Sequence, residues 1–345
     1  MSLEPSLESG GIPPAHRVAI EGLLRRYGLE LKRAISPVAN SLNNENYRAE
    51  TQDGLRFIRI HRKSQSREAA EAEQAIVAWV GKQGLPVAPA LADRDGRTLH
   101  ALSGVVMSVY PWVAGHQAVH DTRTPQAAHA MGAMHGRLHA LLARYPGESY
   151  PRSGPGPTWD VDASIEELSR VDDLIRYYPS PGEERLRIQA GLREQLALLE
   201  SSEPRPRSDF AELPLQLVHG DYHNGNVLFD DALNVTAVLD WEFAGLRPPM
   251  FEILRAFSLS ELFGQPLKDA YLFGYAEHNR LPRELCGLAV EVAWQALLHS
   301  TWDYHQRFIE GNRRVDPLNL IERIRRWSEP GFRAGLLELL LAHAE

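Results

Sequence analysis

The stretch from Leu217 to Trp241 constrains the fold of this 345-residue chain more than any other part of it. Two apolar runs flank the polar loop HGDYHNGN, residues 219–226, and a third run, residues 235–239, follows a turn and ends at Asp240. Runs of this length separated by turn residues predict short paired strands. We therefore expect a hairpin that brings Asp221, Asn226 and Asp240 to one end of a single small sheet.

The side chains gathered there indicate a metal-dependent reaction. Two carboxylates and an amide oxygen are hard oxygen ligands of the kind that Mg²⁺ prefers, and Asp221 could also serve as a base or orienter for a hydroxyl nucleophile. A rival interpretation takes His219, Asp221 and His223 with Asp240 as a zinc hydrolase cluster. The loop-forming glycines speak against it, as does Asn226, which would then have no role. A zinc requirement for hydrolysis, against Mg²⁺ and ATP for transfer, separates the two.

Composition excludes several classes of protein. With 43% hydrophobic and 24% charged residues the chain is globular rather than disordered. No apolar run reaches the ~18 residues of a membrane span, and the N-terminus has no signal-peptide pattern. The single cysteine, Cys286, excludes an internal disulfide. These features predict a cytoplasmic protein without a membrane partner, and the net charge of −8 disfavours a nucleic-acid partner.

The distribution of predicted elements indicates an α+β protein with two lobes. After a helix over 12–33, the first lobe has strand-like runs at 47–51, 55–61 and 104–110 and a helix over 67–83. The remainder is mainly helical around the β segment 215–241, with helices expected at 125–145, 160–178, 182–200, 266–280, 282–310, 316–328 and 330–343. We place the boundary near residue 113, which gives an N-terminal lobe 1–113 and a C-terminal lobe 114–345.

The loop motif also resembles a known superfamily. HGDYHNGN, with an asparagine five residues after the aspartate and LDW nineteen after it, is similar to the catalytic segment of aminoglycoside phosphotransferases and choline kinase-like proteins. These are relatives of protein kinases. The resemblance implies a bilobal, protein-kinase-like fold and transfer of the ATP γ-phosphate to a hydroxyl of a small metabolite or antibiotic, with ATP and Mg²⁺ as cofactors. It implies that Asp221 is the catalytic base, Asn226 a Mg²⁺ ligand and Asp240 the principal Mg²⁺ ligand.

The same resemblance assigns roles in the N-terminal lobe. Glu73 falls where the small-lobe helix offers a glutamate to the basic residue that contacts phosphate. The run Met107, Ser108, Val109 and Tyr110 would form the hinge between lobes, where backbone groups bind adenine. These four residues and Glu73 are therefore expected to contribute to nucleotide binding.

The chain departs from the family pattern at two places in this lobe. Arg59 stands in the strand where a lysine is expected, and none of the four lysines lies in that strand. A guanidinium can hold phosphate oxygens bidentately, so nucleotide binding is feasible. The expected nucleotide-covering loop, residues 40–46, contains no glycine, although asparagine tolerates a left-handed backbone. Glu252 also replaces a common aspartate, and we interpret it as a structural buttress.

Two other functions of the same superfamily stay open. Arg59 and the glycine-free loop favour a nucleotide-binding pseudokinase, whereas Asp221, Asn226 and Asp240 oppose it. A protein serine/threonine kinase is the other.

The segment from His305 to Arg333 contains seven arginines and four acidic residues. A basic segment of this kind suits a neutral, zwitterionic or anionic hydroxyl compound as the acceptor better than a polycation. Residues 312–318 resemble homoserine kinases of this superfamily.

Overall fold

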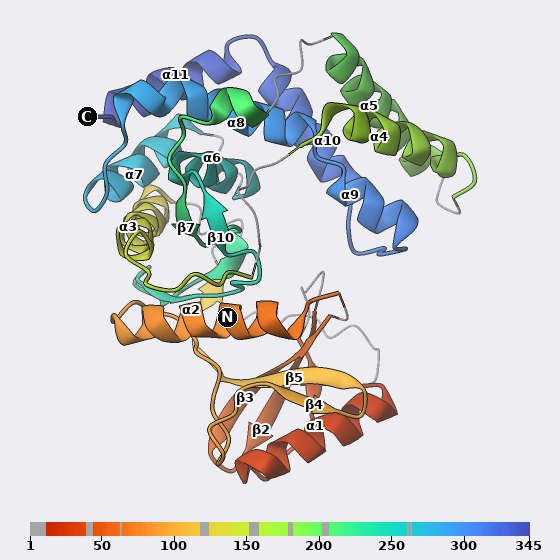
Figure 1. Cartoon of the computed structure of the whole chain (residues 1–345), viewed down its shortest axis with the longest axis vertical. Helices are drawn as coiled ribbons and strands as arrows, with labels where there is room; N and C mark the ends of the chain where they lie inside the picture. Colours follow the sequence, from red (N-terminus) through yellow and green to blue (C-terminus); the bar gives the residue numbers. More distant parts are fainter. Residues whose placement is uncertain are drawn as a thin grey trace. The chain divides into compact units, whose positions relative to one another are not determined.

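The computed structural model divides into two compact units (Figure 1). Unit 1 comprises Met1–Val119, Arg144–Ser153 and Gly225–Ala244, and unit 2 comprises His120–Ala143, Gly154–Asn224 and Gly245–Glu345. The structure describes residues 12–38, 44–62, 64–117, 124–151, 159–178, 182–201, 207–260, 262 and 264–345. The division differs from a single boundary near residue 113, because residues 225–244 pack with the N-terminal part of the chain.

Unit 1 is built on a five-stranded antiparallel sheet of order β1-β2-β3-β5-β4. The strands are β1 (Ser36–Pro37), β2 (Glu45–Thr51), β3 (Gly54–His61), β4 (His100–Leu102) and β5 (Val105–Pro111). Gly54, at φ 102°, allows the tight turn that joins β2 to β3. In the resulting register Arg59 of β3 lies opposite Asn46 of β2 on one side and Ser108 of β5 on the other.

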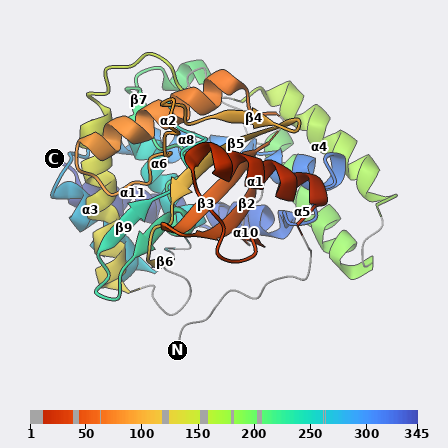
Figure 2. The same cartoon turned by 90° about the horizontal axis from the view of Figure 1, so that it is seen from below.

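Strand alternation assigns the two faces of this sheet to different helices. Ile58 and Ile60 belong to the apolar cluster that α1 (Pro14–Tyr27) covers (Figures 1 and 2). Arg59 points to the opposite face, where it meets α2 (Arg67–Lys82). The helix predicted over 12–33 is too long, because Gly28 adopts a left-handed conformation at φ 69° and ends α1.

A second, three-stranded sheet of unit 1 has the order β6-β8-β9. It consists of β6 (His116–Gln117), β8 (Val227–Phe229) and β9 (Val235–Val238), and a 3₁₀ turn (Asn224–Asn226) precedes β8. Strand β7 (Gln216–Val218) instead pairs with β10 (Gly245–Arg247) in unit 2. The single small sheet predicted for residues 215–241 is therefore wrong. The reason is that β7 finds its hydrogen-bonding partner in a strand that the sequence pattern did not predict.

Unit 2 is mainly helical, and α4 (Val161–Ile175) and α5 (Gly182–Ser201) lie side by side in it (Figures 1 and 2). The single helix predicted over 282–310 is wrong, because the chain leaves α8 at His299 and resumes as the short α9 and a π turn (His305–Ile309). Helix α6 was not predicted. None of the described helices is long and apolar enough to span a bilayer. The helices are α3 (Pro125–Leu142), α4 (Val161–Ile175), α5 (Gly182–Ser201), α6 (Pro249–Leu259), α7 (Gln265–Ala276), α8 (Cys286–Leu298), α9 (Trp302–Tyr304), α10 (Pro317–Ser328) and α11 (Phe332–His343), with 3₁₀ turns at Arg207–Phe210 and Arg283–Leu285.

Candidate active site

The β8–β9 hairpin places Asn226 and Asp240 at the same end of the second sheet of unit 1. Val227 pairs with Val238, and the Leu239 N–H donates to the Asn226 carbonyl at 2.8 Å just beyond that pair. Asp240 follows with φ 59°, a left-handed conformation that is uncommon for a residue other than glycine. Backbone strain of this kind concentrates at functional sites. Two oxygen-bearing side chains are thus anchored at one hairpin end.

Arg59 connects that hairpin end to the first sheet and to α2. Its Nη1 donates to Glu73 Oε1 at 3.1 Å, and its Nη2 donates to Asp240 Oδ1 at 3.2 Å. Arg59 and Glu73 are only 7% and 4% exposed, respectively. The guanidinium therefore lies fixed between two carboxylates that come from different elements.

The charges of Arg59, Glu73 and Asp240 depend on one another. Burial disfavours the charge on Arg59, but Asp240 and Glu73 outweigh it and raise the pKa of the guanidinium. Burial and the Asp240 charge raise the pKa of Glu73 to about 7, although Arg59 acts in the opposite sense. Arg59 is thus a permanent cation with fixed donors. An anion such as a phosphate group could take over one of its contacts.

Glu242 is a buried carboxylate of the same segment that the sequence interpretation missed. The Asn44 side-chain amide donates to Glu242 Oε2 at 3.0 Å, and Asn44 Oδ1 accepts from the Arg62 N–H at 3.1 Å. Its place two residues after Asp240 is the signal that could have identified it. Residues 40–43 of the expected nucleotide-covering loop 40–46 lie outside the described residues. Asn44 is the first described residue of that loop, and Glu242 accepts a hydrogen bond from its side chain.

The four residues predicted as a hinge lie within β5. Ser108 and Tyr110 pair with Arg59 and Phe57 of β3, and Val109 O accepts from the Leu91 N–H at 2.8 Å. The Ser108 hydroxyl is buried and bonded to His61 and Gln74. Met107 and Val109 are fully buried in the apolar cluster beneath α1. Residues 107–110 are therefore interior to a sheet rather than a connection between units, and the open backbone that follows β5 begins after Pro111.

Asp221 belongs to unit 2, where a buried network supports its loop. Glu252 of α6 accepts a hydrogen bond from the Gly220 N–H. His135 Nε2 and His139 Nε2 of α3 lie 3.0 and 2.8 Å from the other Glu252 oxygen. Glu252 thus acts as the expected buttress, and it connects the Asp221 loop to α3.

The supporting network needs no metal to satisfy it. His135, His139 and Glu252 form the one group of metal-type ligands that lie close together among the described residues. However, the Nδ1 atoms of the two histidines bond to the hydroxyls of Tyr271 and Tyr275. Burial lowers the pKa of His135 to about 3, and the two histidines hold the pKa of Glu252 well below its usual value. Each imidazole can donate from Nε2 to Glu252 and accept a tyrosine hydroxyl at Nδ1, which accounts for every contact.

Asp221 itself lies between two basic groups. Arg255 Nη2 of α6 donates to Asp221 Oδ1 at 2.8 Å, and His223 Nε2 lies 3.4 Å from Oδ2. Burial alone would raise the pKa of this carboxyl, but His223 and Arg255 hold it well below its usual value. His219 instead accepts the Asp221 backbone N–H at 3.2 Å. The sequence interpretation missed Arg255, because it comes from a helix that was not predicted.

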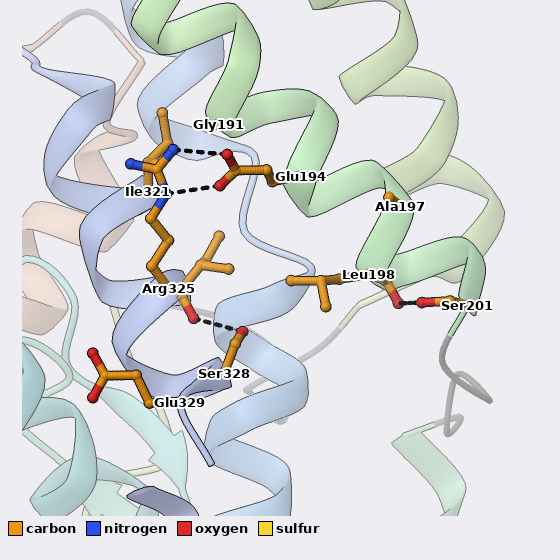
Figure 3. A pocket seen from close by; sticks show the side chains of 10 residues that line it. Gly191, Glu194, Ala197, Leu198, Ser201, Ile321, Arg325, Ser328 and Glu329 are labelled. Atoms are coloured by element: carbon orange, nitrogen blue, oxygen red, sulfur yellow. Dashed lines mark hydrogen bonds and ion pairs between the residues drawn. The ribbon is translucent and has the colours of Figure 1, made fainter.

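A hollow of about 440 Å³ between α5 and α10 lies apart from these residues (Figure 3). Leu198, Ile321 and Ile324 supply its apolar lining, and Arg325 reaches across to Glu194 with contacts of 2.7 and 2.9 Å. None of the predicted site residues lines it.

The sequence and the fold of this chain are similar to those of a known class of enzyme. The sequence profile of the phosphotransferase enzyme family matches residues 34–288, and the chain belongs to that family. The homoserine kinase of Caulobacter vibrioides is 26% identical over 227 residues, which is 65% of each chain. Stress response kinase A of Salmonella choleraesuis is 29% identical over 236 residues, 65% of this chain and 66% of that protein. The matched segments thus cover about two thirds of the length of these relatives.

Solved structures confirm the predicted kinase-like α+β fold. The amicoumacin kinase hAmiN, in complex with AMP-PNP, Ca²⁺ and Ami, superposes with a TM-score of 0.59 at 16% identity, over 92% of this chain and 93% of that one. Spectinomycin phosphotransferase APH(9)-Ia, in complex with ADP and spectinomycin, gives 0.58 at 14% identity over 94% and 97%. A choline/ethanolamine kinase family protein from Mesorhizobium loti gives 0.55 at 19% identity over 95% and 98%. At these identities the likeness establishes the fold.

Proposed function

We propose that this protein transfers the γ-phosphate of ATP to a hydroxyl group of a small molecule. The observation that carries the proposal is the contact of one guanidinium, Arg59, with both Glu73 and Asp240. This places a fixed cation beside a carboxylate on a strained backbone, as a site for a metal-bound polyphosphate requires. Membership of the phosphotransferase family supports the same reaction.

The residues at the end of the β8–β9 hairpin fit Mg²⁺. Asn226 and Asp240 offer hard oxygen donors, and the Asp240 side chain is 32% exposed, so its carboxylate is accessible. When bound, Mg²⁺ neutralises charge on the phosphate oxygens. Arg59 would donate to the α- and β-phosphates, and Glu73 would hold the guanidinium in place. Glu242 would keep Asn44 in position.

Asp221 would act on the acceptor. Its carboxylate orients the hydroxyl and takes the proton as the acceptor oxygen bonds to phosphorus and ADP leaves. Because its pKa lies well below the usual value, Asp221 is a weak base. Its main task is therefore to orient the hydroxyl, and a loose transition state asks little of the base. The Glu252 network keeps the loop in place during the transfer.

The variant Asp221→Asn tests this assignment. It preserves size and most polar contacts but removes the charge, so turnover should fall by about 10²–10⁴-fold while ATP affinity stays near that of the wild type. ADP release with a screened hydroxyl acceptor measures turnover, and calorimetry measures affinity. Asp231→Asn, on the exposed turn before β9, is the matched control and should behave as the wild type. Equal turnover in Asp221→Asn and the wild type would contradict the proposal.

A protein serine/threonine kinase is the second candidate. A relative from Salmonella typhimurium that bears that name, RdoA, is 29% identical over 236 residues. A polypeptide acceptor would then be phosphorylated where small hydroxyl compounds are not. The same ADP-release screen, run with serine- and threonine-containing peptides, separates this candidate from the small-molecule kinase. The pseudokinase alternative predicts ATP binding without ADP release on any acceptor.

A further inference from the structure

Asp221 forms one group with three charged side chains from three helices of unit 2. Arg255 of α6 lies 2.8 Å from Asp221, and Arg323 of α10 lies 3.8 Å from Asp303 of α9. Arg323 is close enough to Arg255 and Asp221 for their charges to act on it. Any acceptor that reaches Asp221 must therefore lie against this group of two arginines and two aspartates.

Both oxygens of Asp221 face basic groups. Arg255 occupies Oδ1, and His223 lies beside Oδ2. Each carboxylate oxygen has two lone pairs, so a neutral hydroxyl could bind beside these groups, but it would share Asp221 with a cation, which costs the carboxylate strength as an acceptor and as a base. An acceptor that offers Arg255 another anion removes this cost, because the guanidinium then exchanges one carboxylate for another.

Arg255 is the accessible member of the group. Its side chain is 36% exposed, against 16% for Arg323 and 12% for Asp303. Its Nε and the Ser258 hydroxyl, three residues further along the same helix, are buried and have no hydrogen-bond partner among the described residues. Buried polar groups of this kind are normally satisfied. The unused donors therefore point to a polar ligand on this face of α6.

The Asp303–Arg323 pair, which is less exposed than Arg255, also favours an anionic ligand. At 3.8 Å the Asp303–Arg323 contact is too long for a hydrogen bond, so Arg323 keeps donor capacity. Burial and the Arg255 charge lower the pKa of Arg323, and burial raises the pKa of Asp303. Two arginines repel one another here, and an added anion between them would relieve that repulsion. A dianionic phosphate would face two aspartates, so a singly charged, planar carboxylate fits better.

We propose that the acceptor carries a carboxylate near its hydroxyl, and that Arg255, assisted by Arg323, binds this carboxylate and thereby releases Asp221 to orient the hydroxyl. The inference rests on the proposed phosphotransfer and names its substrate class as hydroxy acids, amino acids included. A polycationic acceptor would meet two arginines at the same place.

The test compares hydroxy acids with their carboxamides. We would measure ADP release with 4-hydroxybutyrate, homoserine and serine, each beside the amide of the same compound. The wild type should prefer the acids by at least tenfold in kcat/KM. Arg255→Ala should lose most of this preference, and Arg255→Lys should recover part of it, because the charge is kept and the fork is lost. Arg313→Ala, an exposed arginine of the same basic stretch, is the control and should keep the wild-type preference.

A pH profile separates carboxylate binding by Arg255 from a merely structural role. Removal of the Arg255 charge should raise the pKa of Asp221, so the acidic limb of kcat/KM should move to higher pH in Arg255→Ala but less in Arg255→Lys. A wild type that prefers amides, or an acid preference that survives in Arg255→Ala, would overturn the inference while leaving the phosphotransfer intact. Binding of ATP without ADP release on acids, amides or other alcohols would overturn the proposed function itself.

Discussion

Arg59 stands where the family pattern has a lysine, and it contacts Glu73, the carboxylate expected to pair with that lysine. The longer, forked guanidinium reaches Glu73 and Asp240 at once, with contacts of 3.1 and 3.2 Å. A lysine ammonium is a single point of charge and would be shared between these carboxylates. The arginine thus holds Asp240 in place before any nucleotide arrives.

Replacing Arg59 should weaken ATP binding. Arg59→Ala removes charge-assisted contacts to phosphate and should cost on the order of 1.5–3 kcal/mol of binding free energy. Arg59→Lys should restore part of that, since it keeps the charge. Titration of Mg²⁺-ATP into the two variants and the wild type measures the difference, with exposed Arg170→Ala as the control. Unchanged affinity in Arg59→Ala would mean that the nucleotide does not use this guanidinium.

The buried imidazole of His135 predicts a loss of stability in acid. Its pKa is lowered from 6.5 to about 3, so the unfolded chain takes up a proton that the folded chain refuses. The stabilisation is therefore complete above pH 6.5 and is lost as the pH falls towards 3. His135→Gln should reduce the slope of unfolding free energy against pH by up to about 1.4 kcal/mol per unit in that window.

Urea unfolding at several pH values measures that slope. The pKa values of His61 and His299 are also lowered by burial, to about 4, so a residual slope should remain in His135→Gln. His129→Gln, at a partly exposed position of the same helix, is the comparison variant for the loss of a histidine that is not buried. An identical slope in His135→Gln and the wild type would contradict the assignment of a neutral buried imidazole.

Among the individual site residues, those that belong to one local motif could be predicted from the sequence. Those that long-range packing brings to the site could not. Asp221, Asn226 and Asp240 follow from one segment, and their roles stay predictions. Arg255 becomes visible only once α6 packs beside the loop, because no local spacing connects it to Asp221. Residues 107–110 lie within β5 rather than in a connection, since an apolar run does not reveal where its strand ends, and their part in nucleotide binding stays a prediction.

Among the elements, the α3–α7 pair depends on close backbone approach. A Cβ at Gly132 would overlap the Tyr271 carbonyl oxygen, and one at Gly136 would lie 2.5 Å from the Tyr275 carbonyl oxygen. Tyr271 and Tyr275 are the residues that bond to His135 and His139. The glycines of α3 therefore bring the tyrosines within reach of the histidines that hold Glu252.

Gly132→Ala should separate these helices and destabilise the protein. Overpacking of this kind costs about 1–3 kcal/mol of unfolding free energy. Gly335→Ala in α11 is the matched control, because no atom lies within 4 Å of its added Cβ. That control should be stabilised by about 0.5–1 kcal/mol through the better helix propensity of alanine. Equal effects of the two substitutions in denaturant unfolding would contradict the close-packing account.

The predicted elements were most reliable where helix starts and stops have a chemical signal. Helix α3 begins after the Thr124 cap, with Pro125 in its first turn, as expected. The helix predicted over 282–310 failed because its apolar periodicity continues through a region where the backbone changes from α to π geometry. The pairing of β7 with β10 was missed because both strands are only three residues long.

At the scale of the whole molecule, the chain passes between the two units within the motif itself. Asp221 lies in unit 2, and Asn226 lies in unit 1, since the boundary falls between Asn224 and Gly225. The resemblance of the motif to a known superfamily could predict the fold class, because all its residues lie within one short segment of the sequence. It could not predict that residues 225–244 pack with the N-terminal unit, since that depends on contacts such as the one between Val238 N–H and Pro86 O at 2.9 Å.

Titration of Mg²⁺-ATP into Asp240→Asn and the wild type tests the central claim most directly. Asparagine tolerates the left-handed backbone at this position, whereas alanine would add strain, so the variant keeps the backbone and removes the charge of the metal ligand together with its ion pair to Arg59. The account predicts measurable binding by the wild type and by the Asp231→Asn control, loss of binding on adding a chelator, and at least tenfold weaker binding by Asp240→Asn at ordinary magnesium. Equal affinity of Asp240→Asn and the wild type would contradict it.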